Sequence, residues 1–367
     1  MYTWLATAAF GLEGVVKDEL LRLGLNAKAE VGGARFEGSV EDAFLANLYL
    51  SCADRVQLVL AEEKAESFEA LFQVTNNIPW EDILPPDARF PITGHCARSR
   101  LMSVSDCQSI VKKAIVERLK KKYKKDWFPE TGSVYAVQVS LHGDIARITL
   151  NASGDALNRR GYRTWNGEAP LRETLAAAMV LLSPWRMDTP LHDPCCGTGT
   201  LLIEAAFRMA RRAPGLTRSF DMEKWSFANT EKLASLRREA ERQVDFSLIR
   251  DISGSDKDAQ ALVLCNRHIR QAGLEGRIRV FEQDFRSLDL HKENVCFLTN
   301  PPYGERLNDR KTCEKIYRDL NSLVRRHPHS RLAVITAHHG FERCYGQKAK
   351  KKRRLYNGRL ECEFMVF

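Results

Sequence analysis

A glycine-containing segment, Asp-Pro-Cys-Cys-Gly-Thr-Gly-Thr, occupies residues 193–200, between an apolar run and an apolar helical pattern. Gly197 and Gly199 would let a strand turn sharply into a helix and let the backbone approach a ligand closely. Ligands of open α/β sheets bind at this type of strand end. The sequence contains neither GxGxxG at this turn nor GxxxxGK[ST] anywhere, which disfavours a dinucleotide or a nucleoside triphosphate as the ligand.

Two aspartates end the next two predicted strands along the chain. Asp256, in Gly-Ser-Asp-Lys-Asp, could accept hydrogen bonds from ribose hydroxyls, and Asp284, in Glu-Gln-Asp-Phe, could accept one from the exocyclic amine of adenine. Either aspartate, taken alone, is also a good helix N-cap. Three consecutive strand ends that carry glycine or acid favour a nucleoside site.

A fourth strand end carries Asn300, Pro301, Pro302 and Tyr303 directly after an apolar strand. Neither proline has an N–H, so the turn is stiff and its carbonyls are left to accept from other groups. The side-chain oxygen of Asn300 and the carbonyl of Pro301 can both accept from one amino group. Tyr303 offers a flat face on which a base can stack. The motif predicts a pocket for a planar substrate that carries an amine.

The elements that must position these residues alternate between strands and helices after about residue 170, which specifies a doubly wound, mostly parallel sheet. The first 150 or so residues instead indicate a smaller α+β region. Residues 213–250 form a charged, helix-rich insertion. The chain finishes in a predicted hairpin around Asn-Gly-Arg-Leu-Glu-Cys, so we expect seven strands with the last one antiparallel, because a short turn joins only antiparallel neighbours.

Lysine and arginine number 56 against 47 aspartates and glutamates, a net charge of +9. Such an excess favours a polyanionic partner. The helix predicted over about 107–125 has one apolar stripe, and lysines fill the rest of its surface. They could be a solvated face or could contact phosphates. We predict nucleic-acid contacts at Lys112, Lys113, Lys120, Lys121, Lys124 and Lys125, and at Arg159, Arg160 and Arg163 between the two halves.

The ten cysteines include no CxxC pair, so the sequence predicts reduced thiols and no metal site. No run of 18 apolar residues exists and the N-terminus lacks the features of a secretory signal, so we expect no membrane partner and a cytoplasmic protein. The sequence predicts no particular oligomeric state.

Together, these motifs resemble the S-adenosylmethionine-dependent methyltransferases that act on exocyclic amines. The segments SFDMEKW, GYRTWNGEAPLRETLAAA and LYNGRLEC resemble more narrowly the THUMP-domain RNA guanine-N2 methyltransferases, most closely the bacterial 23S rRNA enzymes. ATAAFGLEGVVKDEL, GGARFEG, SVSDCQSIVKKAIVERLK and PETG extend the resemblance to nearly the whole chain. The chain departs from the family at Cys195 and Thr198, where an aromatic residue and serine are commoner, but both glycines are kept.

The resemblance implies a Rossmann-like, seven-stranded methyltransferase domain preceded by a ferredoxin-like and THUMP RNA-binding region. We place the ferredoxin-like module at 1–60, THUMP at 61–155, a linker at 156–166 and the methyltransferase domain at 167–367. The cofactor would be S-adenosylmethionine. Its methionine end would lie against Asp193 and the loop residues Cys196, Gly197, Thr198 and Gly199, with ribose on Asp256 and adenine on Asp284.

The implied reaction is methylation of guanine N2 in structured RNA, 23S rRNA first and tRNA second. Asn300, Pro301, Pro302 and Tyr303 would hold the target base, which must leave its stack to reach them. Enzymes that methylate DNA adenine or protein glutamine share the Asn-Pro-Pro-Tyr motif, so these substrates stay open. A catalytically inert RNA-binding assembly factor is the non-enzymatic alternative.

Overall fold

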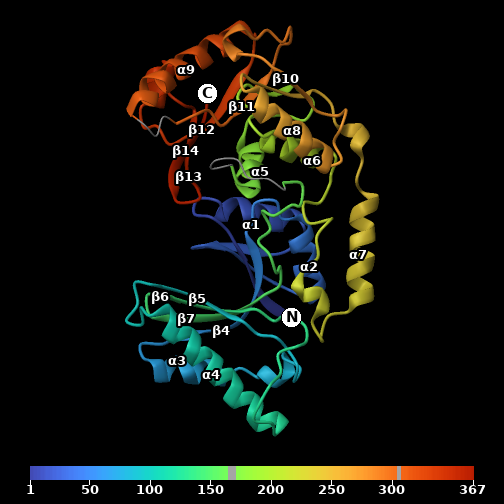
Figure 1. The fold of residues 1–367 in the computed structure, drawn as a ribbon, viewed down its shortest axis with the longest axis vertical. Helices are drawn as coiled ribbons and strands as arrows, with labels where there is room; N and C mark the ends of the chain where they lie inside the picture. Colours follow the sequence, from blue (N-terminus) through green and yellow to red (C-terminus); the bar gives the residue numbers. More distant parts are fainter. Residues whose placement is uncertain (164–170, 304–306) are drawn as a thin grey trace. The chain divides into compact units, whose positions relative to one another are not determined.

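The computed structural model describes residues 1–163, 171–303 and 307–367, which fall into two compact units (Figure 1). The first unit comprises Met1–Ala8, Val16–Leu157 and Arg218–Glu239. The second comprises Ala9–Val15, Asn158–Thr217 and Ala240–Phe367. Each unit is built around one seven-stranded sheet, so each is described by itself.

The sheet of the first unit has the order β2-β3-β1-β4-β7-β6-β5. Its strands are β1 (Tyr2–Thr7), β2 (Ala27–Glu30), β3 (Gly33–Gly38), β4 (Arg55–Lys64), β5 (Ile92–Ala97), β6 (Val137–His142) and β7 (Ile145–Asn151). All neighbours are antiparallel except β5 and β6. The ten-residue β4 pairs with β1 near its start and with β7 along the rest. Strand β4 therefore joins the two predicted N-terminal modules into one sheet, and the module boundary that we placed at residue 60 lies inside this strand.

Most helices of the first unit begin after a capping serine. These helices are α1 (Glu13–Arg22, which begins in the second unit), α2 (Val40–Tyr49), α3 (Phe68–Asn76) and α4 (Val104–Tyr123), with a 3-10 turn η1 at Trp80–Asp82. Ser39 and Asp42 form a capping box on α2, and Ser67 and Ser103 cap α3 and α4. Helix α4 therefore begins at Val104, about three residues before the start predicted from the sequence.

The segment Arg218–Glu239, which follows the glycine loop in the sequence, belongs to the first unit. It contains η2 (Asp221–Lys224) and most of α7 (Thr230–Arg242). Trp225 stacks on Tyr135 with ring centroids 6.0 Å apart, and the Met222 N–H donates to the Ala152 carbonyl at 3.1 Å. The Tyr135 hydroxyl accepts from the Ser226 N–H at 2.8 Å. The SFDMEKW motif is therefore a packing motif of the N-terminal unit.

The sheet of the second unit has the order β10-β9-β8-β11-β12-β14-β13. Its strands are β8 (Leu191–Asp193), β9 (Ile252–Asp256), β10 (Arg279–Glu282), β11 (Cys296–Thr299), β12 (Arg331–Thr336), β13 (Lys351–Asn357) and β14 (Leu360–Val366). The first five are mutually parallel, and β14 runs antiparallel between β12 and β13. The predicted seven-stranded sheet with an antiparallel last strand is confirmed.

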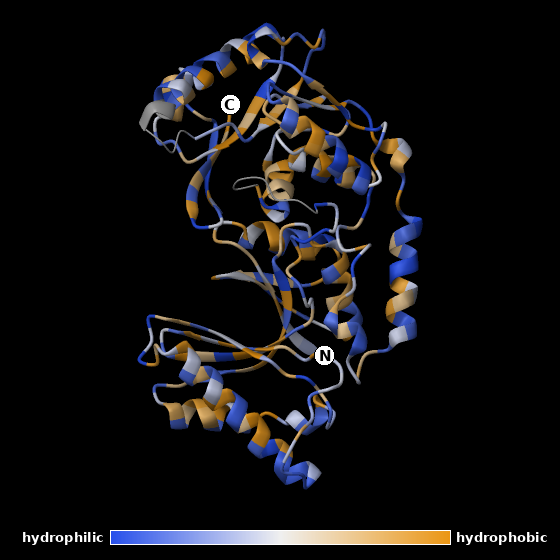
Figure 2. Cartoon of the chain, viewed as in Figure 1, coloured by the Kyte–Doolittle hydropathy of each residue, from blue (hydrophilic) through white to orange (hydrophobic). Residues whose placement is uncertain are grey.

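Helices flank this sheet: α5 (Glu173–Leu182), α6 (Thr200–Met209), α8 (Ala259–Gln271), α9 (Leu307–Arg326) and α10 (Phe341–Tyr345), with η3 (Phe246–Leu248) and η4 (Phe285–Ser287). The central strands are apolar, as Figure 2 shows, and β11 is buried along its whole length. Phe297 of β11, Tyr317 of α9 and Val334 of β12 lie in one core cluster. Parallel strands that are covered on both faces appear in the sequence as continuous apolar runs, and these strands could therefore be predicted from it.

No helix among the described residues is long and apolar enough to cross a membrane. The residues that the structure describes also contain no group of three or more His, Cys, Asp or Glu side chains placed to hold a metal ion.

Candidate active site

A pocket of about 520 Å³ opens in the second unit beside the carboxyl ends of β9, β10 and β11. It brings together seven residues predicted from the sequence: Gly197, Asp256, Asp284, Asn300, Pro301, Pro302 and Tyr303. The sequence did not indicate the other lining residues, which are Pro194, Cys195, Lys257, Gln283, Phe285, Arg286, Ile316, Asn357, Arg359 and Leu360. Five of these ten are adjacent in sequence to a predicted residue, and the last three belong to the β13–β14 hairpin.

The two glycines of the loop have different tasks. Gly197 has φ +49°, and a Cβ built on it would meet no heavy atom within 4 Å, so the backbone here faces open space. Its N–H donates to Asp256 Oδ2 at 2.8 Å, which ties the loop to the end of β9. Gly199 has φ +82°, and its Cβ would lie 2.5 Å from Cys265 Sγ. Gly199 therefore lets α6 begin close against α8, and it does not line the pocket.

Three further predicted cofactor residues also lie behind the loop surface. Cys196 is 6% exposed, and its N–H donates to the Ser255 carbonyl at 3.0 Å. The Thr198 carbonyl is 3.1 Å from the Nδ1 of His268. Asp193 is 2% exposed and accepts from the Cys195 N–H at 3.1 Å. In this structure Asp193, Cys196 and Thr198 support the loop and are absent from the pocket lining.

Burial raises the pKa of Asp193 to about 7, because it removes water from around the carboxylate, and the nearby Asp256 adds a smaller upward shift. His192, the residue before it, has its pKa lowered to about 3 by burial. Its ring nitrogens lie 2.9 and 3.1 Å from the hydroxyls of Ser253 and Ser255. The imidazole is therefore neutral at physiological pH and crosslinks β8 to β9.

The two strand-end aspartates combine local capping with a place in the pocket. Asp256 accepts from the Asp258 N–H at 3.0 Å in addition to its bond from Gly197. Asp284 caps η4 by accepting from the Arg286 N–H at 2.9 Å, and its other oxygen lies 3.2 Å from the Arg286 guanidinium. Both carboxylates keep lone pairs for a ligand, because a carboxylate has about four acceptor sites.

The Asn-Pro-Pro-Tyr turn begins where β11 ends. Pro301 is buried, and the Tyr317 hydroxyl donates to the Pro302 carbonyl at 2.8 Å, so the turn is fixed to the core. The Tyr303 hydroxyl donates to Asn300 Oδ1, an interaction that the stacking role predicted for Tyr303 did not include. This bond fixes which side of the Asn300 amide presents its oxygen, and that oxygen keeps a second lone pair for another donor.

The lysines predicted to contact nucleic acid differ in their exposure and in their ion pairs. On α4 and directly after it, Lys113, Lys121, Lys124 and Lys125 are exposed and form no ion pair among the described residues. Lys120 lies 3.7 Å from Glu117. Lys112 pairs with Glu130 at 2.5 Å and lies 3.6 Å from the centroid of the Phe90 ring, so this lysine already has protein partners.

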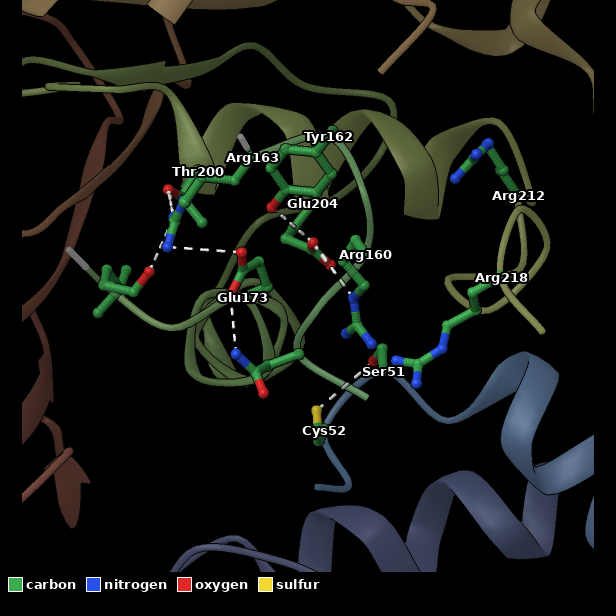
Figure 3. Close-up of polar contacts among 12 residues, drawn as sticks. Ser51, Cys52, Arg160, Tyr162, Arg163, Glu173, Thr200, Glu204, Arg212 and Arg218 are labelled. Atoms are coloured by element: carbon green, nitrogen blue, oxygen red, sulfur yellow. Dashed lines mark hydrogen bonds and ion pairs between the residues drawn. The ribbon is translucent and has the colours of Figure 1, made fainter. Parts of the chain in front are cut away.

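The arginines between the two halves are placed differently from our prediction. Arg159 is exposed, but Arg160 is 3% exposed and lies 3.6 Å from Glu204, which also accepts from the Tyr162 hydroxyl at 2.9 Å (Figure 3). Arg163 is 3.4 Å from Glu173 and donates to Thr200 and to the Leu171 carbonyl. Arg160 and Arg163 are therefore structural, because burial and pairing occupy their guanidinium groups. The predicted linker runs past them into residues 164–166, outside the described residues.

Family models match three parts of the chain. Residues 3–57 match an RlmL ferredoxin-like domain, residues 65–151 match a THUMP domain, and residues 160–365 match an RMKL-like methyltransferase domain. The last match covers more than half of the chain. The chain is thus a methyltransferase with an N-terminal ferredoxin-like and THUMP region, which confirms the expected fold class. It belongs to the RMKL-like family, whose members depend on S-adenosylmethionine.

Two relatives of known name illustrate the extent of the similarity. "Putative RNA methyltransferase YpsC" of Bacillus subtilis is 39% identical over 368 residues, which span all of this chain and 96% of the relative. "Ribosomal RNA large subunit methyltransferase K/L" of Syntrophotalea carbinolica is 34% identical over 382 residues, covering 99% of this chain and 53% of the relative. The chain thus spans nearly all of the first protein and about half of the second.

Two solved structures have the same fold over the whole chain. One, described as SMU.472, a putative methyltransferase complexed with SAH, is 37% identical with a TM-score of 0.95, over 100% of this chain and 97% of that one. The other, described as a predicted N6-adenine-specific DNA methylase from Listeria monocytogenes, is 40% identical with a TM-score of 0.94, over 100% of this chain and 96% of that one.

Proposed function

We propose that this methyltransferase transfers a methyl group from S-adenosylmethionine to the exocyclic N2 of a guanine in structured RNA, with 23S rRNA as the substrate. The observation that carries the proposal is the single pocket in which Asn300–Tyr303 meets Gly197, Asp256 and Asp284. The residues proposed to hold the amine and those proposed to hold the nucleoside therefore line one cavity. An rRNA substrate would also place the enzyme in the cytoplasm.

The chain's own residues fit the cofactor. The open space at Gly197 leaves room for a ligand against the backbone, and the Asp256 and Asp284 carboxylates would accept from ribose hydroxyls and from the adenine amine. The cofactor supplies a methyl group on a positively charged sulfonium, which makes the methyl electrophilic. The protein then mainly positions the two reactants.

The amine would be held by Asn300 Oδ1 and the Pro301 carbonyl. Tyr303 holds the Asn300 amide so that its oxygen faces a donor, and Tyr317 anchors the turn through Pro302. Two acceptors on the two N–H groups would draw density toward nitrogen and favour the pyramidal form whose lone pair can attack. The proton released on transfer would leave through an acceptor at the pocket mouth or through solvent.

An RNA substrate is supported by the THUMP match and by the names of the two relatives, an RNA methyltransferase and an rRNA methyltransferase. The C-terminal end of α4 is hydrophilic in Figure 2. Its exposed lysines would contact phosphates and would not distinguish one RNA sequence from another. A tRNA substrate would use the same surface and is the nearest alternative.

A second candidate is methylation of adenine N6 in DNA, which the description of the Listeria monocytogenes chain favours. Asn-Pro-Pro-Tyr alone does not discriminate, because adenine N6 and guanine N2 are both amines on a planar ring. The distinction needs a direct identification of the product.

The test is to incubate the full chain with radiolabelled S-adenosylmethionine and, separately, deproteinised 23S rRNA, total tRNA, unmethylated DNA and a protein extract. Digestion to nucleosides and mass spectrometry would then identify the labelled product. N2-methylguanosine from 23S rRNA is the expected result. N6-methyladenine from DNA, or label that only protease removes, would overturn the proposal.

Two variants would assign the roles within the pocket. Asn300→Ala should leave cofactor affinity, measured by calorimetry, nearly unchanged while single-turnover methylation collapses, because its oxygen faces the amine. Asp256→Ala should weaken cofactor binding by about 1.5–3 kcal/mol, the range for hydrogen bonds to a charged group. The opposite pattern, with affinity lost only in the Asn300 variant, would show that the roles are reversed.

A further inference from the structure

The turn of the β13–β14 hairpin lies at the pocket but has no role in the mechanism above. Asn357 pairs with Leu360, so Gly358 and Arg359 form a two-residue turn. Gly358 has φ +65° and Arg359 does not have a positive φ, which is the pattern of a type II′ turn with glycine at its first central position. This geometry puts Arg359 at the tip, where it lines the pocket with Asn357 and Leu360.

The hairpin is held firmly, so the position of Arg359 is set by the fold. β14 pairs with β13 over seven residues and with β12 over four. Leu355 is fully buried, and a Cβ on Gly11 would lie 2.3 Å from the Arg354 carbonyl oxygen, so the residue 9–15 segment packs directly on this hairpin. The backbone at Arg359 is therefore in place before a ligand binds, and only the side chain has to be ordered on binding.

Arg359 is one of two pocket-lining cations that form no ion pair among the described residues, and the other, Lys257, directly follows Asp256 at the end of the pocket assigned to ribose. Arg286 is committed to Asp284 and to Asp319, at 3.2 and 2.8 Å. Glu361, the nearest acid in the hairpin sequence, lies 3.4 Å from Arg354 and accepts from the Tyr356 hydroxyl at 2.8 Å. Arg359 forms no ion pair with any residue that the structure describes. Its five N–H donors therefore face a ligand or water.

The exposure of the lining residues indicates which edge of a bound base lies deep in the pocket and which edge lies at its mouth. Pro301 is buried and Asn300 half-buried, whereas Gly358, Arg359 and Leu360 are exposed, so the amine acceptors lie deep and Arg359 lies at the mouth. A guanine whose N2 reaches Asn300 presents its O6 and N7 acceptors away from the floor. An adenine whose N6 reaches the same place presents the ring carbon C2 and N3 instead.

We propose that Arg359 is the specificity-determining residue that reads the O6 and N7 acceptors of the target guanine at the mouth of the pocket. Arginine bonded to O6 and N7 is the commonest base-specific contact in nucleic-acid recognition. The inference rests on the proposed guanine-N2 activity and adds the feature that separates guanine from adenine, which Asn-Pro-Pro-Tyr does not supply.

The test uses an RNA fragment that contains the target nucleotide, made with guanine, 7-deazaguanine or 2-aminopurine at that position. 7-Deazaguanine lacks N7 and 2-aminopurine lacks O6, but both keep the N2 amine. The wild-type kcat/KM should fall about 10- to 100-fold on each analogue, as expected for loss of a good base contact. Arg359→Gln should lose a similar factor on guanine and should treat all three substrates nearly alike.

The control is Lys351→Gln, which removes an exposed cation of the same hairpin at a position outside this pocket. It should keep the wild-type preference for guanine over the analogues, and both variants should keep the wild-type cofactor affinity by calorimetry. If Arg359→Gln retains the full preference for guanine, or lowers all substrates by one common factor, Arg359 does not read the base and the inference is overturned. Identification of N6-methyladenine as the product would instead remove the proposed function itself, so the two failures are distinguishable.

Discussion

The lysines of α4 and the arginines of residues 158–163 look alike in the sequence but differ in the structure. Lys121, Lys124 and Lys125 are exposed at the end of a helix, whereas Arg160 and Arg163 are enclosed with Glu204 and Glu173 (Figure 3). A basic side chain therefore indicates a polyanion only where the protein has left its charge without a partner. The same distinction separates Arg359 from Arg286 within the pocket.

The largest effect should follow from Arg160→Ala. Removing this arginine leaves the Glu204 carboxylate buried without its cation, and breaking a buried pair costs about 3–5 kcal/mol of unfolding free energy. Urea denaturation would measure the loss. The matched control Lys121→Ala should change stability by less than about 0.5 kcal/mol, since it alters only an exposed charge. Equal losses of unfolding free energy in the two variants would contradict the distinction between a buried, paired arginine and an exposed lysine.

The complementary change is to replace Lys113, Lys121, Lys124 and Lys125 by glutamine. Each phosphate contact contributes about 0.7–0.9 to the slope of log affinity against log salt, so the RNA-binding slope should fall by about 3. Lys112→Gln is the control on the same helix, because Glu130 and Phe90 already hold that lysine, and it should leave the slope unchanged. An unaltered slope in the four-lysine variant would mean that this helix face is only solvated. Cofactor affinity should stay constant throughout.

The exposed face of α4 could be predicted because a helix repeats its environment every 3.6 residues. The apolar stripe at Val111, Ala114, Ile115 and Leu119 is buried, and this stripe fixes which lysines face water. The residues at the strand ends could be predicted equally well, because the carboxyl ends of apolar parallel strands lie at one edge of a sheet. Both predictions depend on local periodicity.

The buried arginines could not be assigned in this way, because their partners come from helices further along the chain. One signal was available: Glu173 and Glu204 are each the only acid of a largely buried, mostly apolar helix, and a buried acid needs a polar or cationic partner. The pocket residues of the hairpin were missed for a related reason. β14 enters the sheet between β12 and β13, and this long-range pairing brings Arg359 to Asn300.

Asp193 extends the comparison to a buried acid that forms no ion pair with any residue that the structure describes. Its pKa is raised to about 7 by burial, so between pH 4 and 7 the folded chain holds a proton that the unfolded chain has released. The unfolding free energy should therefore fall as pH rises through this window, by at most about 1.4 kcal/mol per pH unit, and level off above pH 7. Asp193→Asn should remove this contribution. Urea titrations of both proteins at pH 5, 6, 7 and 8 would show it as a difference that grows with pH, and a constant difference would contradict the shift.

The smallest effect is expected from Tyr303→Phe, which deletes one hydroxyl and keeps the ring. The hydroxyl donates to Asn300 Oδ1, so its loss should free the amide to rotate without affecting stacking of the base. A typical hydrogen bond contributes about 0.5–1.5 kcal/mol, so kcat should fall by roughly tenfold or less while cofactor affinity and the substrate KM hold steady. Tyr303→Ala removes the ring as well and should also raise KM. If the phenylalanine variant raises KM and leaves kcat intact, then Tyr303 acts on binding of the base, and the orientation of Asn300 is set by the Asn-Pro-Pro backbone alone.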